Sequence, residues 1–442
     1  MSIITSSKRP SNHSGLSPLH YLAGTVLLAA ICHPAIASAS CVNPSGRAGC
    51  YSTIVAAVAA ASPGTTIHVA PGTYKEDVVI GKELSLIGAD PASTIIDAAG
   101  LSNGIFIDGI DNPGLSNVLI SGFTVEDANF EGILVANASS VTIRGNHVLN
   151  NDTSLDVTTD ACNGPAAFET GETFDCGEGI HLLGAEYSTV ADNVVENNSG
   201  GILLSDDTAE NHDNLITGNF VKNNAYACGI VLASHAPAVG STAAHNGIVH
   251  NTISHNTSTQ NGFQLPGAGA GVGIFTDGSG VGTNTGNIIV DNELTDNGLP
   301  GIAFHSHVGP NFHLPPDNLN DNIIIGNRIS GNGADTGDTA TPGPTGINLN
   351  SGAGGSPITG TVISGNVIDH ETDDVAINTP AEVNLHFNNL LGGQTGVANI
   401  GSGTINATNN YWGCFNGPGS RSCSGVSGTG IVFIPFLRIP IP

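Results

Sequence analysis

The sequence has few basic residues, few aromatic residues and no long apolar run after residue 39. Ten lysines and arginines stand against 37 aspartates and glutamates, and aromatic residues make up 5% of the chain. So little positive charge disfavours binding to nucleic acid or to anionic membranes. No later apolar segment is long enough to span a bilayer. The composition therefore argues against a nucleic-acid-binding protein and against a membrane span.

The first 39 residues have the features of a secretory signal. Two basic residues precede an apolar run over 21–31, and the triplet Ala37-Ser38-Ala39 forms a cleavage site. We expect residues 1–39 to be a signal peptide and the protein to be secreted or periplasmic. The rest of the chain has 8 basic residues against 37 acidic ones, a formal net charge of −29. Cys41 would also suit a lipid anchor, but Ser38 stands where such signals usually have Leu.

Cysteine is scarce, and its spacing does not match a zinc site. An exported protein can keep disulfides, and three close pairs would each close a short loop. The expected pairs are Cys41 with Cys50, Cys162 with Cys176, and Cys414 with Cys423. Cys228 is left over directly before a predicted strand, and we expect it to be a buried thiol rather than a reactive one.

Glycine is abundant, with 60 residues, and asparagine recurs in a repeat of Gly-Asn followed by an aliphatic pair. Asn tolerates turn conformations, and stacked asparagines can form an amide ladder at one corner of a solenoid. The repeated asparagines therefore predict a structural ladder and carry no chemistry. The members of the expected ladder are Asn146, Asn193, Asn219, Asn251, Asn292, Asn327 and Asn366.

The second half of each repeat alternates apolar and variable residues, which places one face inside and one outside. The first apolar position holds Ile105, Ile133, Ile180, Ile202, Ile230, Val272, Ile302 and Ile347. Stacking such segments builds one aliphatic core, and a unit of about 22–26 residues suits a rung of three strands. We therefore predict an all-β fold, a right-handed parallel β-helix that forms a single domain over residues 40–442.

A solenoid needs covered ends. We expect residues 40–64 to cap the N-terminal end, with a short amphipathic helix over 52–62. Residues 405–442 are expected to cap the other end, with Trp412, the only tryptophan, plugging the last rung.

The opening of the predicted domain resembles the pectate-lyase-like superfamily of β-helix proteins. The matching residues are Tyr51-x-Thr53-Ile54-x-x-Ala57-Val58, Pro71-Gly72-Thr73-Tyr74 and Leu86-Ile87-Gly88. The resemblance covers nearly the whole chain after residue 39 and implies the β-helix fold. It implies little about activity, because this scaffold hosts lyases, hydrolases, esterases, epimerases and non-catalytic proteins.

Motifs of the well-marked members of that superfamily are missing. The Gln-Asp-Thr block of pectin methylesterases, the Gly-His-Gly of polygalacturonases and the Asp-Pro-His-Asp of mannuronan epimerases do not occur. Pectate lyases use an arginine base, but Arg144 and Arg328 are the only central arginines and both lie in the predicted Asn-corner strands. The chain therefore fits none of these activities by motif.

Acids and imidazoles recur at equivalent outward positions of successive predicted strands. Because equal positions of a β-helix stack at about 4.8 Å per rung, these side chains should form one patch. Five residues are expected to carry chemistry: Asp207, His235, Asp277, His305 and His307. Five others are expected to bind substrate: His181, Ser205, His313, Asn348 and Asn350.

Two catalytic versions follow from this patch. Asp207 and Asp277 should lie two rungs apart, about 9–10 Å, close to the carboxyl separation of inverting glycosidases. They would then be the acid and the base that cleave a polysaccharide. Alternatively, His235 or His307 removes a proton beside a uronate, in a lyase or an epimerase. A very acidic surface repels polyanionic sugars, which favours hydrolysis, or else an elimination in which a cation held by the aspartates neutralises the uronate carboxylate.

A divalent cation, Ca²⁺ or Zn²⁺, is compatible with this patch, although no cofactor is required. His305-x-His307, with Asp277 and His235, is one set that could hold zinc or manganese. The same row could also be a solvated ladder sustained by cross-strand pairing.

The main rival to an enzyme is a non-catalytic envelope or adhesion β-helix that binds glycan. Such a binder should show rows of exposed aromatic residues, and the outward columns hold only Phe106 and Phe275. A polysaccharide is the expected partner in either case, and a monomer is the expected state.

Overall fold

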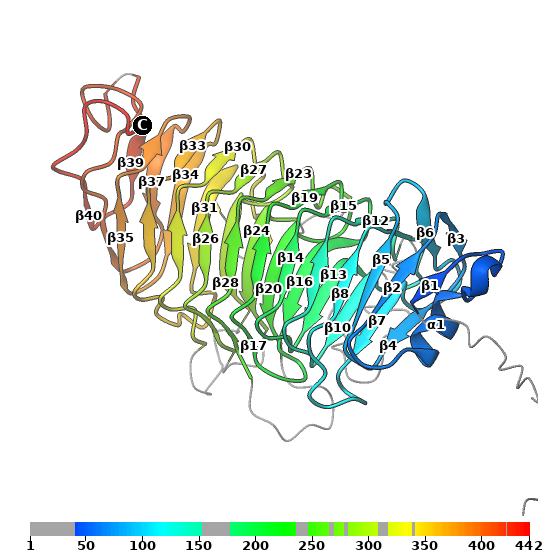
Figure 1. The fold of residues 1–442 in the computed structure, drawn as a ribbon. Helices are drawn as coiled ribbons and strands as arrows, with labels where there is room; N and C mark the ends of the chain where they lie inside the picture. The colour runs from blue at the N-terminus through cyan, green and yellow to red at the C-terminus, as the bar shows by residue number, and fades with distance from the viewer. Residues whose placement is uncertain are drawn as a thin grey trace, which may run out of the picture. The chain divides into compact units, whose positions relative to one another are not determined.

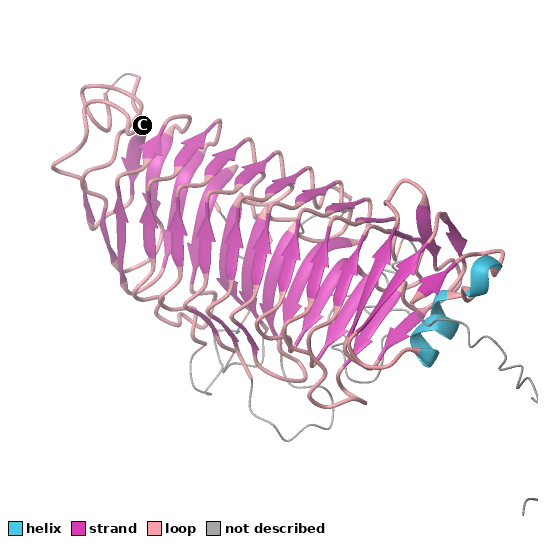
Figure 2. Cartoon of the chain, in the orientation of Figure 1, coloured by secondary structure: helices cyan, strands magenta, loops and turns pink. Residues whose placement is uncertain are grey.

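The computed structural model describes residues 40–152, 177–235, 246–264, 269–277, 282–307, 317–337, 341–420 and 422–442. These residues belong to one compact unit. The expected signal peptide lies outside them, as do His313 and the cysteines Cys162 and Cys176. The described chain is a solenoid of short parallel strands, with one α-helix at its N-terminal end (Figures 1 and 2).

Three long sheets of 14, 11 and 12 strands run along the solenoid, and a typical coil contributes one strand to each. Sheet 1 contains β1 (Cys41–Val42), β2 (Thr65–Val69), β5 (Leu84–Gly88), β8 (Leu119–Ser121), β11 (Thr142–Arg144), β14 (Thr189–Ala191), β18 (Leu215–Thr217), β22 (Thr252–Ser254), β26 (Ile288–Val290), β29 (Ile323–Ile325), β32 (Val362–Ser364), β35 (Glu382–His386), β38 (Thr404–Asn406) and β40 (Ile431–Val432). Sheet 2 contains β3 (Gly72–Tyr74), β6 (Thr94–Asp97), β9 (Thr124–Glu126), β12 (His147–Leu149), β15 (Val194–Glu196), β19 (Phe220–Lys222), β23 (Thr257–Thr259), β27 (Glu293–Thr295), β30 (Arg328–Ser330), β33 (Val367–Asp369) and β36 (Asn389–Leu390).

Sheet 3 carries the predicted site. It contains β4 (Val78–Ile80), β7 (Ile105–Asp108), β10 (Ile133–Ala136), β13 (Glu178–Leu183), β16 (Gly200–Ser205), β20 (Ile230–Ser234), β24 (Val272–Thr276), β28 (Ile302–Ser306), β31 (Thr345–Asn350), β34 (Asp373–Asn378), β37 (Thr395–Asn399) and β39 (Gly425–Ser427). A small fourth sheet joins β17 (Asn211–His212), β21 (Ile248–Val249) and β25 (Asn284–Thr285).

The aliphatic positions predicted from the repeat stack in register inside the solenoid. In sheet 3, Ile180 pairs with Ile202, and Ile202 pairs with Ile230. All three side chains are buried in the main core, and full burial of such a side chain stabilises the fold by about 1.5–3 kcal/mol. The predicted right-handed parallel β-helix is confirmed.

Asparagine ladders line three corners, where the sequence predicted one. The first ladder contains Asn146, Asn193, Asn219, Asn256, Asn292, Asn327, Asn366, Asn388 and Asn410. The assignment of Asn251 to this ladder was wrong: it stacks between Asn214 and Asn287 in another ladder. The cause is that Asn251 and Asn256 lie five residues apart in the same coil and both fit the repeat pattern, so the spacing did not tell which of them stacks on Asn219.

Both ends of the solenoid are covered. Helix α1 (Ile54–Ala60) is capped by Thr53, and the Glu76 carboxylate accepts hydrogen bonds from the amides of Ile54 and Val55. Trp412 is fully buried at the opposite end of the core. Disulfides join Cys41 to Cys50 and Cys414 to Cys423, one near each end.

Within the described part of the chain, no helix has the length and apolar character that crossing a membrane would need.

Candidate functional site

The stacking of β16, β20, β24 and β28 brings the predicted acids and imidazoles into one row. Ser205 pairs with Ala233, Ala233 with Phe275, and Phe275 with His305. The row of Asp207, His235, Asp277 and His307 follows the ends of these strands. The backbone amide of Asp277 bonds to β20, and that of His307 bonds to β24, so the register continues past the strands.

The structure buries most of the predicted row, which the sequence places on the outward face of the strands. Asp207, His235 and His305 are buried, whereas Asp277 is half-buried and His307 is exposed. The reason is that the outward face of sheet 3 is itself apolar in this region. Leu203, Val231, Ala233 and Ala303 form a second apolar cluster there, together with Cys228, Ala270 and Leu299. Asp277 and His307 are therefore the more accessible members of the row.

Asp207 and His235 form a buried ion pair. Oδ2 of Asp207 lies 3.1 Å from Nδ1 of His235. Burial alone would raise the pKa of Asp207, but the His235 charge and hydrogen bond, with the nearby His181 and Ser205, outweigh it and hold the pKa below its usual value. This carboxyl is therefore ionised at neutral pH.

His305 and His307 contact each other directly. Their Nε2 atoms lie 2.7 Å apart, and Nδ1 of His307 lies 2.9 Å from the carbonyl oxygen of Thr276. Because a carbonyl can only accept, His307 carries a proton on Nδ1, and Nε2 of a neutral His307 accepts from His305. Phe275 packs on His305, with ring centroids 4.4 Å apart.

Asp206, next to the predicted Asp207, was not singled out from the sequence. It accepts hydrogen bonds from the amides of His235 (2.8 Å) and Gly247 (2.6 Å) and from the Ser234 hydroxyl (3.0 Å). Burial raises its pKa to about 6, although these bonds and the His235 charge lower it. Asp206 thus fixes the backbone that positions His235.

A second buried cluster surrounds His181, which was predicted only as a substrate contact. Its Nδ1 lies 2.9 Å from Oε1 of Glu131, and its Nε2 lies 2.7 Å from the Ser205 hydroxyl. Glu178, at the start of β13, converges on the same point as Glu131 and His181. Glu131 and Glu178 each directly precede the glycine that opens a strand segment, and the count of positions began after that residue. Two glutamates at the same position of neighbouring coils are the sequence signal that could have identified this cluster.

The predicted substrate-binding asparagines lie elsewhere along sheet 3. Asn348 and Asn350 are buried in β31. Oδ1 of Asn350 accepts from the Gly352 amide at 2.8 Å and from Asn378 at 3.2 Å, so its acceptor is used within the fold. This position does not present a free amide to a substrate.

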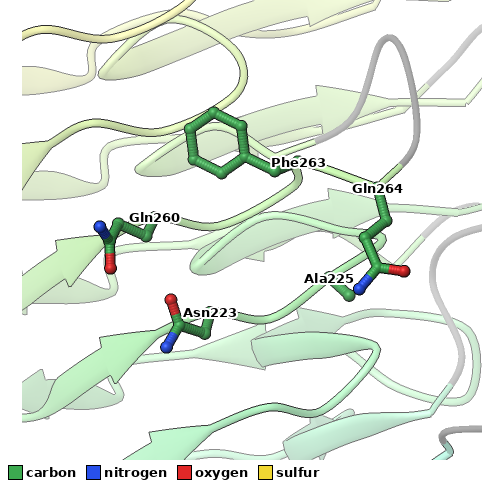
Figure 3. Close-up of a pocket in the computed structure, with 5 residues that line it drawn as sticks. All are labelled: Asn223, Ala225, Gln260, Phe263 and Gln264. Carbon is green, nitrogen blue, oxygen red and sulfur yellow. The ribbon is translucent and has the colours of Figure 1, made fainter.

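Two cavities in the described residues lie away from the predicted row. One, of about 280 Å³, is lined by Asn223, Ala225, Gln260, Phe263 and Gln264 (Figure 3). The other, of about 450 Å³, follows a corner of four coils and contains His212. Partial burial lowers the pKa of His212, but Asp213, Glu210 and Glu186 raise it overall.

A family model described as "Protein of unknown function (DUF1565)" matches residues 41–285 of the chain. No curated protein matches the sequence significantly.

Solved structures that resemble this chain are β-helix proteins of differing activity. The surface adhesin PfbA of Streptococcus pneumoniae is 13% identical, with 86% of this chain and 87% of that chain covered and a TM-score of 0.55. The Dettilon tailspike protein is 14% identical, with 83% and 62% covered and a TM-score of 0.54. A GH87 alpha-1,3-glucanase from Streptomyces thermodiastaticus is 16% identical, with 86% and 65% covered and a TM-score of 0.50. At these identities the similarity shows the fold alone.

Proposed function

The chain belongs to the DUF1565 family, and from that starting point we propose that it is a secreted enzyme that cleaves a polysaccharide by acid–base chemistry. The site is the row that ends at Asp277 and His307. The chain shares its fold with a glucanase, an adhesin and a tailspike, so the fold admits this activity and does not select it.

The observation that carries the proposal is the buried Asp207–His235 pair beside a more accessible carboxyl. His235 keeps Asp207 ionised, and Asp277 follows the strand beyond it, half-buried. Two strand spacings separate the two carboxyls by about 9–10 Å, near the upper end of the range of inverting glycosidases. His235 follows the strand between the two carboxyls and bonds to Asp207, so its imidazole links Asp207 to the space beside Asp277.

In this mechanism the Asp207–His235 pair takes a proton from the attacking water, which bonds to the anomeric carbon. Asp277 gives a proton to the departing glycosidic oxygen as the carbon–oxygen bond breaks. His307, the exposed member of the row, contacts the bound sugar. The products are two sugar ends, one of them reducing.

A polysaccharide panel tests the proposal. Release of reducing ends without absorbance of unsaturated uronate reports hydrolysis, because elimination produces a reducing end and an unsaturated uronate together. We expect hydrolysis, with the rate lowered about 10²–10⁴-fold in Asp277→Asn, because general acid–base catalysis contributes that much. His307→Ala should mainly weaken substrate binding. Asp291→Asn, an exposed turn residue, is the matched control and should leave activity unchanged.

Unchanged activity in both Asp277→Asn and His307→Ala would remove this site assignment. Uronate absorbance that grows in step with the reducing ends would favour the histidine-based elimination instead.

Glycan binding without catalysis is the second candidate, and the pocket in Figure 3 favours it. Phe263 is 65% exposed, and the amides of Asn223, Gln260 and Gln264 line the same cavity (Figure 3). An exposed aromatic ring with amides around it can stack on a sugar and bind its hydroxyls. The sequence search for aromatic rows missed Phe263, because it lies in a loop after sheet 2 and outside the columns of sheet 3.

If this pocket binds glycan, Phe263→Ala should weaken binding of an oligosaccharide about tenfold or more, as measured by calorimetry, since a buried aromatic contact contributes about 1.5 kcal/mol or more. The same substitution should leave the rate on a short soluble substrate unchanged. Equal binding by the variant and the parent protein would exclude the pocket.

A further inference from the structure

We propose that Glu131, Glu178 and His181 form a buried site for a divalent transition-metal ion, and that Zn²⁺ is the ion their donor atoms fit best. The proposal does not depend on the proposed polysaccharide cleavage.

Three neighbouring strands of sheet 3 build this site. Glu131 directly precedes Gly132 before β10, Glu178 and His181 lie in β13, and β13 pairs with β10 and β16. One ligand atom from each of the three residues lies within 4.8 Å of the others. Nδ1 of His181 and Oε1 of Glu131 are 2.9 Å apart. Ligands that bond to one ion at about 2.0–2.2 Å lie about 3 Å apart, so this spacing needs little adjustment.

The cluster gathers negative charge where water is excluded. Glu131 and Glu178 are fully buried and His181 is 2% exposed. Asp152 is also buried, and burial raises its pKa to about 7. The nearby charge of Glu131 adds to this increase. Buried carboxylates must be protonated, paired or bound to a metal.

Positive side chains that could pair with this cluster are scarce. Among the described residues, one ion pair involves a lysine or an arginine. It joins Lys222 to Glu196 on sheet 2, away from this cluster. The sequence from 153 to 176, which follows Asp152, contains no Lys, Arg or His. His181 is therefore the one basic group at the site among the described residues.

Two buried oxygen atoms near this point have no hydrogen-bond partner of normal geometry. They are Oε2 of Glu131 and Oδ1 of Asp152. The backbone amides of Glu178 and Gly177 lie close enough to Glu131 to lower its pKa in part, but burial raises it well above its usual range. Unsatisfied buried oxygen atoms are costly, and a cation would satisfy both the oxygens and the charge.

Ser205 orients the imidazole as an outer-shell partner of a metal site would. Its hydroxyl lies 2.7 Å from Nε2 of His181, which leaves Nδ1 to face Glu131. Histidine ligands commonly donate their second ring N–H to such a partner, which fixes the tautomer and the ring.

The donor set selects among ions. One imidazole nitrogen with two carboxylates suits Zn²⁺, whose protein ligands are His, Cys, Asp and Glu. Ca²⁺ takes six to eight oxygen ligands, and Mg²⁺ keeps several waters, so neither matches a nitrogen-containing buried site.

The test is metal binding by the purified full chain after treatment with a chelator. Calorimetric titration with Zn²⁺ should show one equivalent bound per chain, and Ca²⁺ should not replace it. Glu178→Gln and His181→Ala should lose that equivalent. Ser205→Ala should retain it with about 10–100-fold weaker affinity, the usual cost of removing an outer-shell partner. Glu371→Gln, another buried glutamate in a different rung, should bind Zn²⁺ as the parent protein does.

Absence of stoichiometric Zn²⁺ in the parent protein would overturn the proposal and mean that protons alone neutralise the cluster. Binding retained in both ligand variants would also overturn it, by placing the ion elsewhere. Far-UV circular dichroism checks that each variant keeps its β-structure. If a ligand variant does not fold, the Ser205→Ala affinity and the visible spectrum of bound Co²⁺, which should change in that variant, still decide the question.

Discussion

At the scale of single residues, Glu371 shows how the stacked corners handle charge. It ends an asparagine ladder that runs through Asn151, Asn198, Asn224, Asn261, Asn297 and Asn332. Oε1 of Glu371 accepts hydrogen bonds from the backbone amide and the side chain of Asn332, both at 3.0 Å. Burial raises its pKa from 4.5 to about 7, and the charges of Asp296 and Asp369 add to the shift, while the Asn332 bonds oppose it. A carboxylate thus occupies a place that an amide holds elsewhere.

We expect the free energy of unfolding to reflect that raised pKa. Between pH 4.5 and 7 the folded protein binds this proton more tightly than the unfolded chain, so stability is full below 4.5 and falls as pH rises to 7. Glu371→Gln keeps an acceptor for Asn332 and removes the titration. Its stability relative to the parent protein should therefore rise by on the order of 2 kcal/mol between pH 4.5 and 7 and then level off. Denaturant unfolding at pH 5 and pH 8 measures this, and a pH-independent difference would refute it.

The residues of the predicted row were found from the sequence because strand position determines register. Counting from the opening glycine placed Asp207, His235 and Asp277 in adjacent coils, as the structure has them. The count could not predict how buried these side chains are. It gives the direction in which a side chain points, but not that the outward face carries its own apolar cluster. It also missed Glu131 and Glu178, which lie one residue before the first counted position.

At the scale of elements, the asparagine ladders hold each coil on the next. In the first ladder, Oδ1 of Asn256 accepts from the amide (2.9 Å) and the side chain (3.0 Å) of Asn219. Nδ2 of Asn256 donates to Ile216 and to Asn292. One buried side chain therefore satisfies groups on the coil before its own and on the coil after it.

Asn256→Ala should lower the free energy of unfolding by about 3 kcal/mol, because it leaves both donors of Asn219 and the carbonyl of Ile216 unsatisfied in a buried corner. The control is Asn384→Ala, at an exposed position of β35, where the change should stay within about 0.5 kcal/mol. Thermal or denaturant unfolding of the two variants measures the difference. Equal losses would show that the ladder adds no stability beyond that of a surface amide.

The ladders also show which feature of the elements could not be predicted from the sequence. Spacing predicted a repeated corner, but each coil contains several Asn at corner positions, and spacing alone does not say which corner each one joins. Insertions change the spacing from 26 between Asn193 and Asn219 to 37 between Asn219 and Asn256, which is why Asn251 was assigned to the wrong ladder. The strands of sheet 3 were easier to predict, because apolar and variable residues alternate within each strand segment.

At the scale of the described β-helix, stacking turns distant sequence positions into neighbours and closes both ends. The predicted capping helix and the Trp412 plug follow from composition alone, since an apolar solenoid end cannot face water. Function does not follow in the same way, because the fold is shared by enzymes and by proteins that only bind. In the proposed function, the acid–base chemistry of the row on sheet 3 is what would distinguish an enzyme from a binder.

The most direct measurement is the rate of reducing-end release from the best polysaccharide of the panel by the parent protein and by Asp207→Asn. Asparagine keeps the shape of this buried residue and removes the charge that pairs with His235. If the Asp207–His235 pair and Asp277 act together, the rate falls about 10²-fold or more in this variant, while its fold and Zn²⁺ content stay as in the parent. A rate equal to that of the parent protein would show that the row has no part in cleavage.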